Sequence, residues 1–170
     1  MAQIAAVGTA FPEHSYRQPD VLQALKRVWR NIDLDHERLA RLSRRTGVRR
    51  RHFALPLEAY HAGSSWGDCN TLWSDLAEKL GARAILDALG RAGLQVGDVG
   101  TLIFVSVTGL STPSINARLV NRLALPVTVR RLPLFGLGCV AGDAGLARCA
   151  DLVEPGRQER WCCLRWNSAR

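Results

Sequence analysis

The sequence predicts an α/β domain in which helices pack against a layered sheet. The short run at 102–107 is nearly continuously apolar, which is typical of a buried strand, and the run at 127–135 is also predicted to form a strand. Segments with apolar residues at helical spacing stand before, between and after these runs. Of the 170 residues, 47% are apolar and 22% are charged, which is enough for one globular domain with a core. Strands that alternate with helices in this way favour the α/β class.

The first half of the chain is expected to hold one strand and three helices. Pro19 opens the first helix, because proline fits the first helical turn. Gly47 ends the second, at a position where a left-handed residue is needed, and Asn70 or Thr71 caps the third. In order, the expected elements are a buried strand at Gln3–Ala10, helices at 19–28 and 35–46, mostly loop at 55–70, and a helix ending at Gly93.

The second half is expected to alternate between strands and helices. The run Leu102–Val107 predicts a strand covered on both faces. Thr112-Pro113 opens a helix, and Val127–Phe135 forms the next strand. A tight turn at 136–139 then leads into a helix over Val140–Val153, which is rich in small residues.

The charge balance and the hydropathy pattern exclude several classes of protein. The net charge is +8, from 23 Lys and Arg against 15 Asp and Glu, which suits either a polyanionic ligand or a solvated Arg-rich surface. No nucleic-acid-binding motif accompanies this charge, so we expect no nucleic-acid partner. No apolar stretch approaches the roughly 18 residues of a membrane span, and the N-terminus has no basic leader pattern. We therefore expect a cytoplasmic protein whose five cysteines are thiols, with no bound metal or cofactor.

A glycine-rich turn around Cys139 is the first candidate site. The segment reads Gly136-Leu137-Gly138-Cys139-Val140-Ala141-Gly142 and lies at a predicted strand-to-helix junction. The partial positive charge at a helix N-terminus favours a thiolate, and flanking glycines let a substrate carbonyl approach the backbone. This pattern suits an acyl-transferring cysteine. A structural cysteine packed in a glycine-rich turn fits the same spacing.

A stripe of arginines on the second predicted helix is the second candidate site. Arg38, Arg41 and Arg45 are spaced i, i+3, i+7 and so share one helical face. Such a stripe can bind the phosphates of a nucleotide-like ligand through charge-assisted hydrogen bonds. A solvated helix face explains the same pattern.

The third candidate is the loop that directly follows the first buried strand. It reads Thr108-Gly109-Leu110-Ser111-Thr112-Pro113. It suits a loop that lines a substrate pocket, and it equally suits a capped helix start.

Taken together, these segments resemble the type III polyketide synthases, the chalcone and stilbene synthase family. The similarity runs collinearly over about nine-tenths of the chain, and its most specific part is the cysteine-centred turn. The matching segments are 4–12, 46–51, 105–109 with Pro113-Ser114, 131–133 and 136–142.

The resemblance implies a fold, an activity and a role for each candidate residue. The fold is thiolase-like, with a mixed sheet and helices, and this chain supplies its N-terminal half. Cys139 is the nucleophile that a CoA-linked starter acylates, and malonyl-CoA then extends the acyl group by decarboxylative Claisen condensation. Arg38, Arg41 and Arg45 hold the CoA phosphates. Thr108 lines the initiation pocket, and Thr112 lies on a loop that reaches toward the partner subunit of a homodimer.

The chain departs from the family pattern in two respects. The catalytic His and Asn of the family lie well downstream, and none of the four histidines here sits in a matching motif. The resemblance therefore implies that this chain is inactive or only partly active alone. Asp143 stands where a small residue is expected and places a carboxylate within one helical turn of Cys139, which opposes thiolate formation.

The sequence from residue 157 onward does not resemble the family, unlike the sequence before it. We divide the chain into 1–156, similar to a synthase N-terminal half, and 157–170, an out-of-frame or divergent tail of poor strand character. Read from the third base of each codon, Trp161-Cys162 gives GTG for valine, and Cys162-Cys163 gives CTG or TTG for leucine. The shifted frame permits an apolar strand that ends on Glu. Cys162-Cys163 is also a weak candidate for a metal or redox pair, since a second pair is lacking.

Two alternatives to a polyketide synthase remain at this point. A ketoacyl synthase III-like condensing enzyme shares the cysteine nucleophile and the Thr-Gly-Val-Arg-Arg-Arg segment at 46–51. A non-catalytic fragment, either inert or a binding partner of a full-length relative, is the other. Labelling of the thiol by a starter acyl-CoA separates an active half from an inert one.

Overall fold

The computed structural model describes residues 3–33, 35–61, 64–152 and 160–165. These residues form two compact units. One joins the N-terminal segment up to Ala10 to the chain from Gly67 onward, and the other holds Phe11–Trp66. The division between 156 and 157 concerns the origin of the tail, and it stays a prediction.

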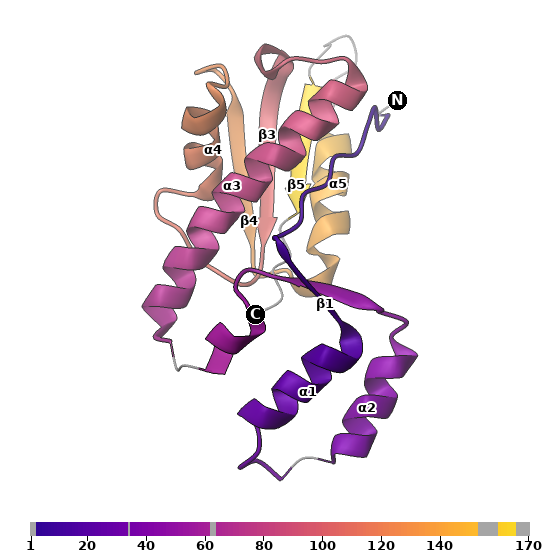
Figure 1. Cartoon of the computed structure of the whole chain (residues 1–170). Helices are drawn as coiled ribbons and strands as arrows, with labels where there is room; N and C mark the ends of the chain where they lie inside the picture. The colour runs from indigo at the N-terminus through magenta and orange to yellow at the C-terminus, as the bar shows by residue number, and fades with distance from the viewer. Residues whose placement is uncertain (1–2, 34, 62–63, 153–159, 166–170) are drawn as a thin grey trace. The chain divides into compact units, whose positions relative to one another are not determined.

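A three-stranded parallel sheet forms the centre of the larger unit. It consists of β3 (Val99–Ser106), β4 (Arg130–Phe135) and β5 (Arg160–Arg165), in the order β4-β3-β5 (Figure 1). Ser106 at the end of β3 pairs with Phe135 at the end of β4. The carboxyl ends of these two strands therefore lie at one edge of the sheet.

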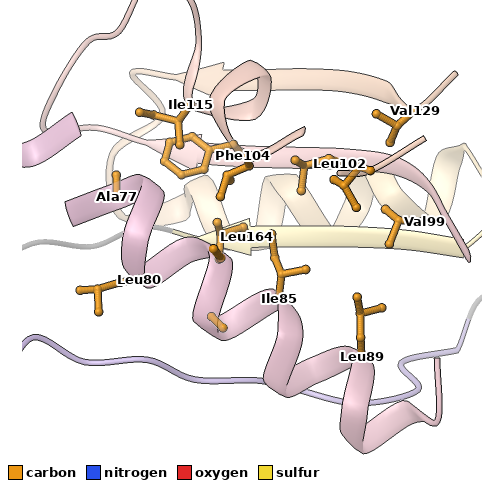
Figure 2. Close-up of a cluster of buried hydrophobic side chains, with 14 of the residues drawn as sticks. Ala77, Leu80, Ile85, Leu89, Val99, Leu102, Phe104, Ile115, Val129 and Leu164 are labelled. Atoms are coloured by element: carbon orange, nitrogen blue, oxygen red, sulfur yellow. The ribbon is translucent and has the colours of Figure 1, made fainter. Parts of the chain in front are cut away.

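Helices cover both faces of this sheet. On one face, the buried residues of α3 (Trp66–Ala92) and α4 (Ile115–Leu123) pack on Leu102 and Phe104 of β3 (Figure 2). On the other face, Ala141 of α5 (Ala141–Asp151) packs on Ile103 and Val105. The predicted strand covered on both faces is thus confirmed, and it is one of the most deeply buried segments described.

A buried hydrogen bond joins α4 to the central strand. The Nδ2 amide of Asn116 is buried and donates a hydrogen bond of 2.8 Å to the carbonyl oxygen of Leu102. A buried amide of this kind costs free energy unless it is paired. The bond therefore fixes where the first turn of α4 sits on the sheet.

The smaller unit is built from a two-stranded ladder and two helices. β1 (His14–Arg17) pairs antiparallel with β2 (Arg50–Phe53), and α1 (Gln18–Val28) and α2 (His36–Arg45) lie between them in the chain. A short 3-10 helix, η1 (Leu57–His61), follows. Both helices were predicted, whereas the polar sequences of the two strands gave no strand pattern.

The predicted first strand at Gln3–Ala10 is wrong. These residues all lie within the described part and form no strand. A Cβ on Gly8 would overlap the backbone of Ala84 in α3, so the segment lies directly against the helix. The amide of Thr9 donates to the Asp87 carboxylate at 3.1 Å. A hydrogen bond from Arg91, with a further one from Thr9, lowers the pKa of Asp87.

The start of the long helix also differs from the prediction. α3 begins at Trp66, inside the segment expected to be mostly loop, and η1 occupies another part of that segment. Asn70 does not cap the helix, because its side-chain amide bonds the backbone of Leu110 instead. The end was predicted correctly: α3 stops at Ala92, and Gly93 takes a φ of 66°.

The remaining elements are shorter than expected or were missed. α4 begins two residues after Pro113, β4 begins three residues after Val127, and α5 ends at Asp151. The expected poor strand character of the tail is wrong for Arg160–Arg165, which form β5 and bury Leu164 in the core. Within the described ranges, no helix has the length and apolarity needed to cross a membrane.

Candidate active site

Cys139 lies in the connection between β4 and α5. β4 ends at Phe135, and a short 3-10 helix, η3 (Gly138–Val140), leads directly into α5. Gly136 and Gly138 have φ values of 86° and 59°, a region that L-residues with a Cβ rarely adopt. The two glycines let the chain turn sharply from strand to helix, and the turn leaves Cys139 exposed.

The structure brings the Cys139 turn and the Thr108 loop to the same edge of the sheet. The amide of Gly136 donates a hydrogen bond of 3.3 Å to the carbonyl oxygen of Ser106, the last residue of β3. Thr108 follows two residues later, is half-buried, and donates its amide to the Ser106 hydroxyl at 3.4 Å. Ligands of parallel α/β sheets bind outside the carboxyl ends of the strands, which is where both segments lie.

Asn70 and Trp73 of α3 hold the Thr108 loop. The Asn70 side chain donates to the Leu110 carbonyl at 2.8 Å and accepts from the Leu110 amide at 2.9 Å. The Trp73 indole lies so close to Gly109 that a Cβ there would overlap the ring. Sequence reasoning missed both residues, since nothing local links them to a loop forty positions away. Gly109 was the available signal, because it permits the close approach.

Exposed apolar residues lie within the Cys139 turn and directly after β3. Leu137 and Val140 flank Cys139 in the chain, and Val107 follows the end of β3. All three are exposed, Val140 by 58%. An exposed apolar surface next to a thiol suits contact with an apolar ligand.

Asp143 lies in the first turn of α5 and is exposed. The N-terminal end of a helix carries a partial positive charge that attracts anions. A carboxylate in the first turn takes up part of that stabilisation itself. The effect of Asp143 on a negative charge at Cys139 stays a prediction.

The three arginines lie on α2 in the smaller unit, and all are exposed. The Asp35 carboxylate caps the helix by accepting the Arg38 amide at 2.8 Å. On the inner face, Ser43 is buried and accepts a hydrogen bond of 2.6 Å from Gln18. This contact orients α2 so that Arg38, Arg41 and Arg45 face outward. Their common helical face is confirmed by the structure, and their ligand stays a prediction.

Thr112 lies in the exposed connection between β3 and α4. The Ser111 hydroxyl next to it donates to the Pro113 carbonyl at 2.6 Å, which shapes this part of the loop. The role of Thr112 at a subunit interface stays a prediction. Among the described residues, no group of three or more His, Cys, Asp or Glu side chains is placed to hold a metal ion.

The parallel sheet with a cysteine at a strand-to-helix turn is one half of a thiolase-like fold. The chain belongs to the chalcone and stilbene synthase family: the family model described as "Chalcone and stilbene synthases, N-terminal domain" matches residues 1–163. The resemblance inferred from the motifs is thereby confirmed.

Several curated relatives are bacterial type III polyketide synthases or related enzymes. The chain is 40% identical over 150 residues to 1,3,6,8-tetrahydroxynaphthalene synthase of Streptomyces peucetius subsp. caesius. This match covers 88% of the chain and 40% of the relative. The chain is 32% identical over 157 residues to phloroglucinol synthase of Pseudomonas fluorescens, covering 91% and 44%.

A solved structure supports the same family assignment. The crystal structure of 1,3,6,8-tetrahydroxynaphthalene synthase from Streptomyces coelicolor A3(2), a bacterial type III polyketide synthase, matches with a TM-score of 0.86 at 30% identity. The match covers 96% of this chain and 47% of that one. The chain thus spans less than half the length of these three relatives.

Proposed function

We propose that this chain carries the acyl-loading half of a type III polyketide synthase, with Cys139 as the acyl acceptor. The thiol sulfur attacks the thioester carbonyl of a CoA-linked starter, the carbon–sulfur bond to CoA breaks, and the acyl group stays on Cys139. The observation that carries the proposal is the exposed thiol at the carboxyl edge of β3 and β4, in a turn opened by two left-handed glycines. The exposed apolar residues next to it suit the starter's acyl group.

The arginine stripe supplies the second part of the proposal. Arg38, Arg41 and Arg45 bind the phosphates of CoA, because guanidinium groups form charge-assisted hydrogen bonds with phosphate oxygens. CoA enters as part of the thioester substrate and leaves as the free thiol, and no resident cofactor is required. The Thr108 loop lines the starter pocket, and Thr112 faces the second subunit of a homodimer in the cytoplasm.

Extension is a separate step. In the family it requires a His and an Asn that act on malonyl-CoA during decarboxylation and Claisen condensation, and residues 1–170 hold no matching motif for either. We therefore assign starter loading to this chain. Extension requires the His and Asn of the family in addition to the cysteine. A purely structural role for the chain is the competing proposal.

Release of CoA tests the proposal directly. On mixing with a starter acyl-CoA, the reduced chain is expected to liberate a burst of free CoA approaching one equivalent, and the Cys139→Ala variant to liberate none. A combined Arg38→Ala, Arg41→Ala and Arg45→Ala variant is expected to slow the burst with acyl-CoA. The same variant is expected to react normally with a short acyl thioester that lacks the nucleotide. An unchanged burst in Cys139→Ala overturns the assignment of the nucleophile.

The matched control for charge is Arg83→Ala. Arg83 is an exposed arginine on α3 in the other unit. If its loss slows the burst as much as loss of the stripe, general positive charge explains the effect and the assigned phosphate site is wrong.

A further inference from the structure

Two cysteines other than Cys139 are in contact where helix α5 packs on strand β5. Cys149 lies on α5 and Cys163 on β5, and their thiols form a hydrogen bond. Both pack against the buried cluster of Ile103, Val105 and Ala141 between α5 and the sheet, and both are half-buried. The chemistry proposed for Cys139 uses neither of them.

The packing of α5 on β5 fixes this contact. Gly145 precedes Cys149 by one helical turn and so shares its helix face. A Cβ on Gly145 would lie 2.9 Å from the Cys163 Sγ, which shows that the thiol sits directly on the helix surface. The absence of a side chain at this position therefore lets the β5 thiol reach α5.

The alternation of side chains along β5 separates the two adjacent cysteines. Successive residues of a strand point to opposite faces of the sheet. Cys162 packs with the cluster under α3 and α4, whereas Cys163 packs with the cluster under α5. The neighbouring pair Cys162-Cys163, considered earlier as a redox or metal pair, is thus split between two faces, and Cys149 is the partner of Cys163.

The hydrogen bond makes the two thiols chemically unequal. Cys163 donates to Cys149, which lowers the pKa of Cys149, and the same bond together with burial raises the pKa of Cys163. The thiolate is the reactive form of cysteine. Cys149 is therefore suited to attack an oxidant, and Cys163, which packs beside it, is positioned to react with the product.

We propose that Cys149 and Cys163 form a dithiol site that hydroperoxides convert into a disulfide. The Cys149 thiolate attacks a peroxide oxygen, the O–O bond breaks, and hydroxide or alkoxide leaves, which produces a sulfenic acid on Cys149. The Cys163 sulfur then attacks the Cys149 sulfur, the S–O bond breaks and an S–S bond forms. Water leaves with the Cys163 proton, so two thiols are oxidised and one peroxide is reduced.

The 170-residue chain tests this site in a Cys139→Ser background, which removes the exposed thiol. Under native conditions with one equivalent of hydrogen peroxide, the number of free thiols is expected to fall from four to two. Trypsin releases Cys149 in peptide 149–157 and Cys163 in peptide 161–165. Mass spectrometry is expected to find these two peptides linked before reduction.

Single variants decide which thiols are joined, because peptide 161–165 also contains Cys162. Cys149→Ala and Cys163→Ala are each expected to abolish the link, while the matched control Cys162→Ala is expected to retain it. Oxidation after unfolding in urea is expected to give mixed disulfides that include Cys69. A link that survives in Cys163→Ala, or four thiols that stay free in the folded chain, overturns the proposal.

Discussion

The amide of Gly136 donates a hydrogen bond of 3.3 Å to the carbonyl oxygen of Ser106. The bond continues the β3–β4 ladder by one residue beyond Phe135. Beyond it the two chains separate, one toward Thr108 and the other toward Cys139. The position of the candidate nucleophile therefore depends on a backbone contact that only a residue tolerant of positive φ can make at 136.

Gly136→Ala is expected to destabilise the fold by about 1–3 kcal/mol, because the alanine Cβ is strained at a φ of 86°. Urea denaturation measures the free energy of unfolding. The matched control is Gly97→Ala in η2 (Val96–Asp98), where the φ is not left-handed and nothing lies within 4 Å of the added Cβ. Equal unfolding free energies for the two variants would contradict the role of the Gly136 turn.

Asn70→Ala is expected to release the Thr108 loop, since it removes both hydrogen bonds to the Leu110 backbone. Each bond contributes about 0.5–1.5 kcal/mol net. Hydrogen exchange of the Leu110 amide should accelerate by about tenfold, while exchange in the centre of β3 stays slow. Asn121→Ala on α4, an exposed position, serves as the control. Unchanged exchange at Leu110 would mean that Asn70 does not hold the loop.

Local sequence patterns predicted the elements whose signals are local. Apolar spacing and a terminal glycine located α2 and the end of α3, and a continuous apolar run located β3. The segment 3–10 has a similar apolar character but no strand partner, because Gly8 packs against the α3 backbone instead. The packing of segment 3–10 on α3 depends on residues about eighty positions away in the chain. No local sequence pattern encodes it.

In the candidate site, too, features with a local sequence signal were predicted and those set by distant residues were missed. The Cys139 turn was recognisable from its glycines, since positive φ is a local property. Asn70 was predicted as a helix cap, a local role, yet its side chain serves a loop distant in the chain. The tail was the larger failure: its arginines and tryptophans obscured a core of Cys162, Cys163 and Leu164 that pairs with β3.

Asp143→Asn is expected to increase the rate at which iodoacetamide alkylates Cys139, by about twofold at low salt, because a nearby negative charge disfavours the thiolate. The increase should shrink in 1 M salt, where exposed charges are screened. Asp151→Asn, at the opposite end of α5, is the control and should leave the rate unchanged. A rate in Asp143→Asn equal to or below that of the unmodified chain would refute an opposing role for this carboxylate.

Burial, followed by the charge of Cys149, raises the pKa of Cys162 to about 11, above the usual range of a cysteine thiol. Between pH 9 and 11 the unfolded chain therefore loses this proton before the folded chain does, so stability falls as the pH rises through this range. The expected loss is about 2–3 kcal/mol. Cys162→Val keeps the volume and removes the titration, so under reducing conditions its unfolding free energy should fall less over the same range. An equal fall in both proteins would contradict the assignment.

Of the five cysteines, Cys139 is the proposed acyl acceptor. The most direct test exposes the reduced, folded chain to a starter acyl-CoA and locates the acyl group by peptide mass spectrometry. We expect an acyl thioester on peptide 132–148, which contains Cys139 and no other cysteine, and we expect none in Cys139→Ala. An acyl group on peptide 149–157 or 161–165, or no acylation of any cysteine, would contradict it.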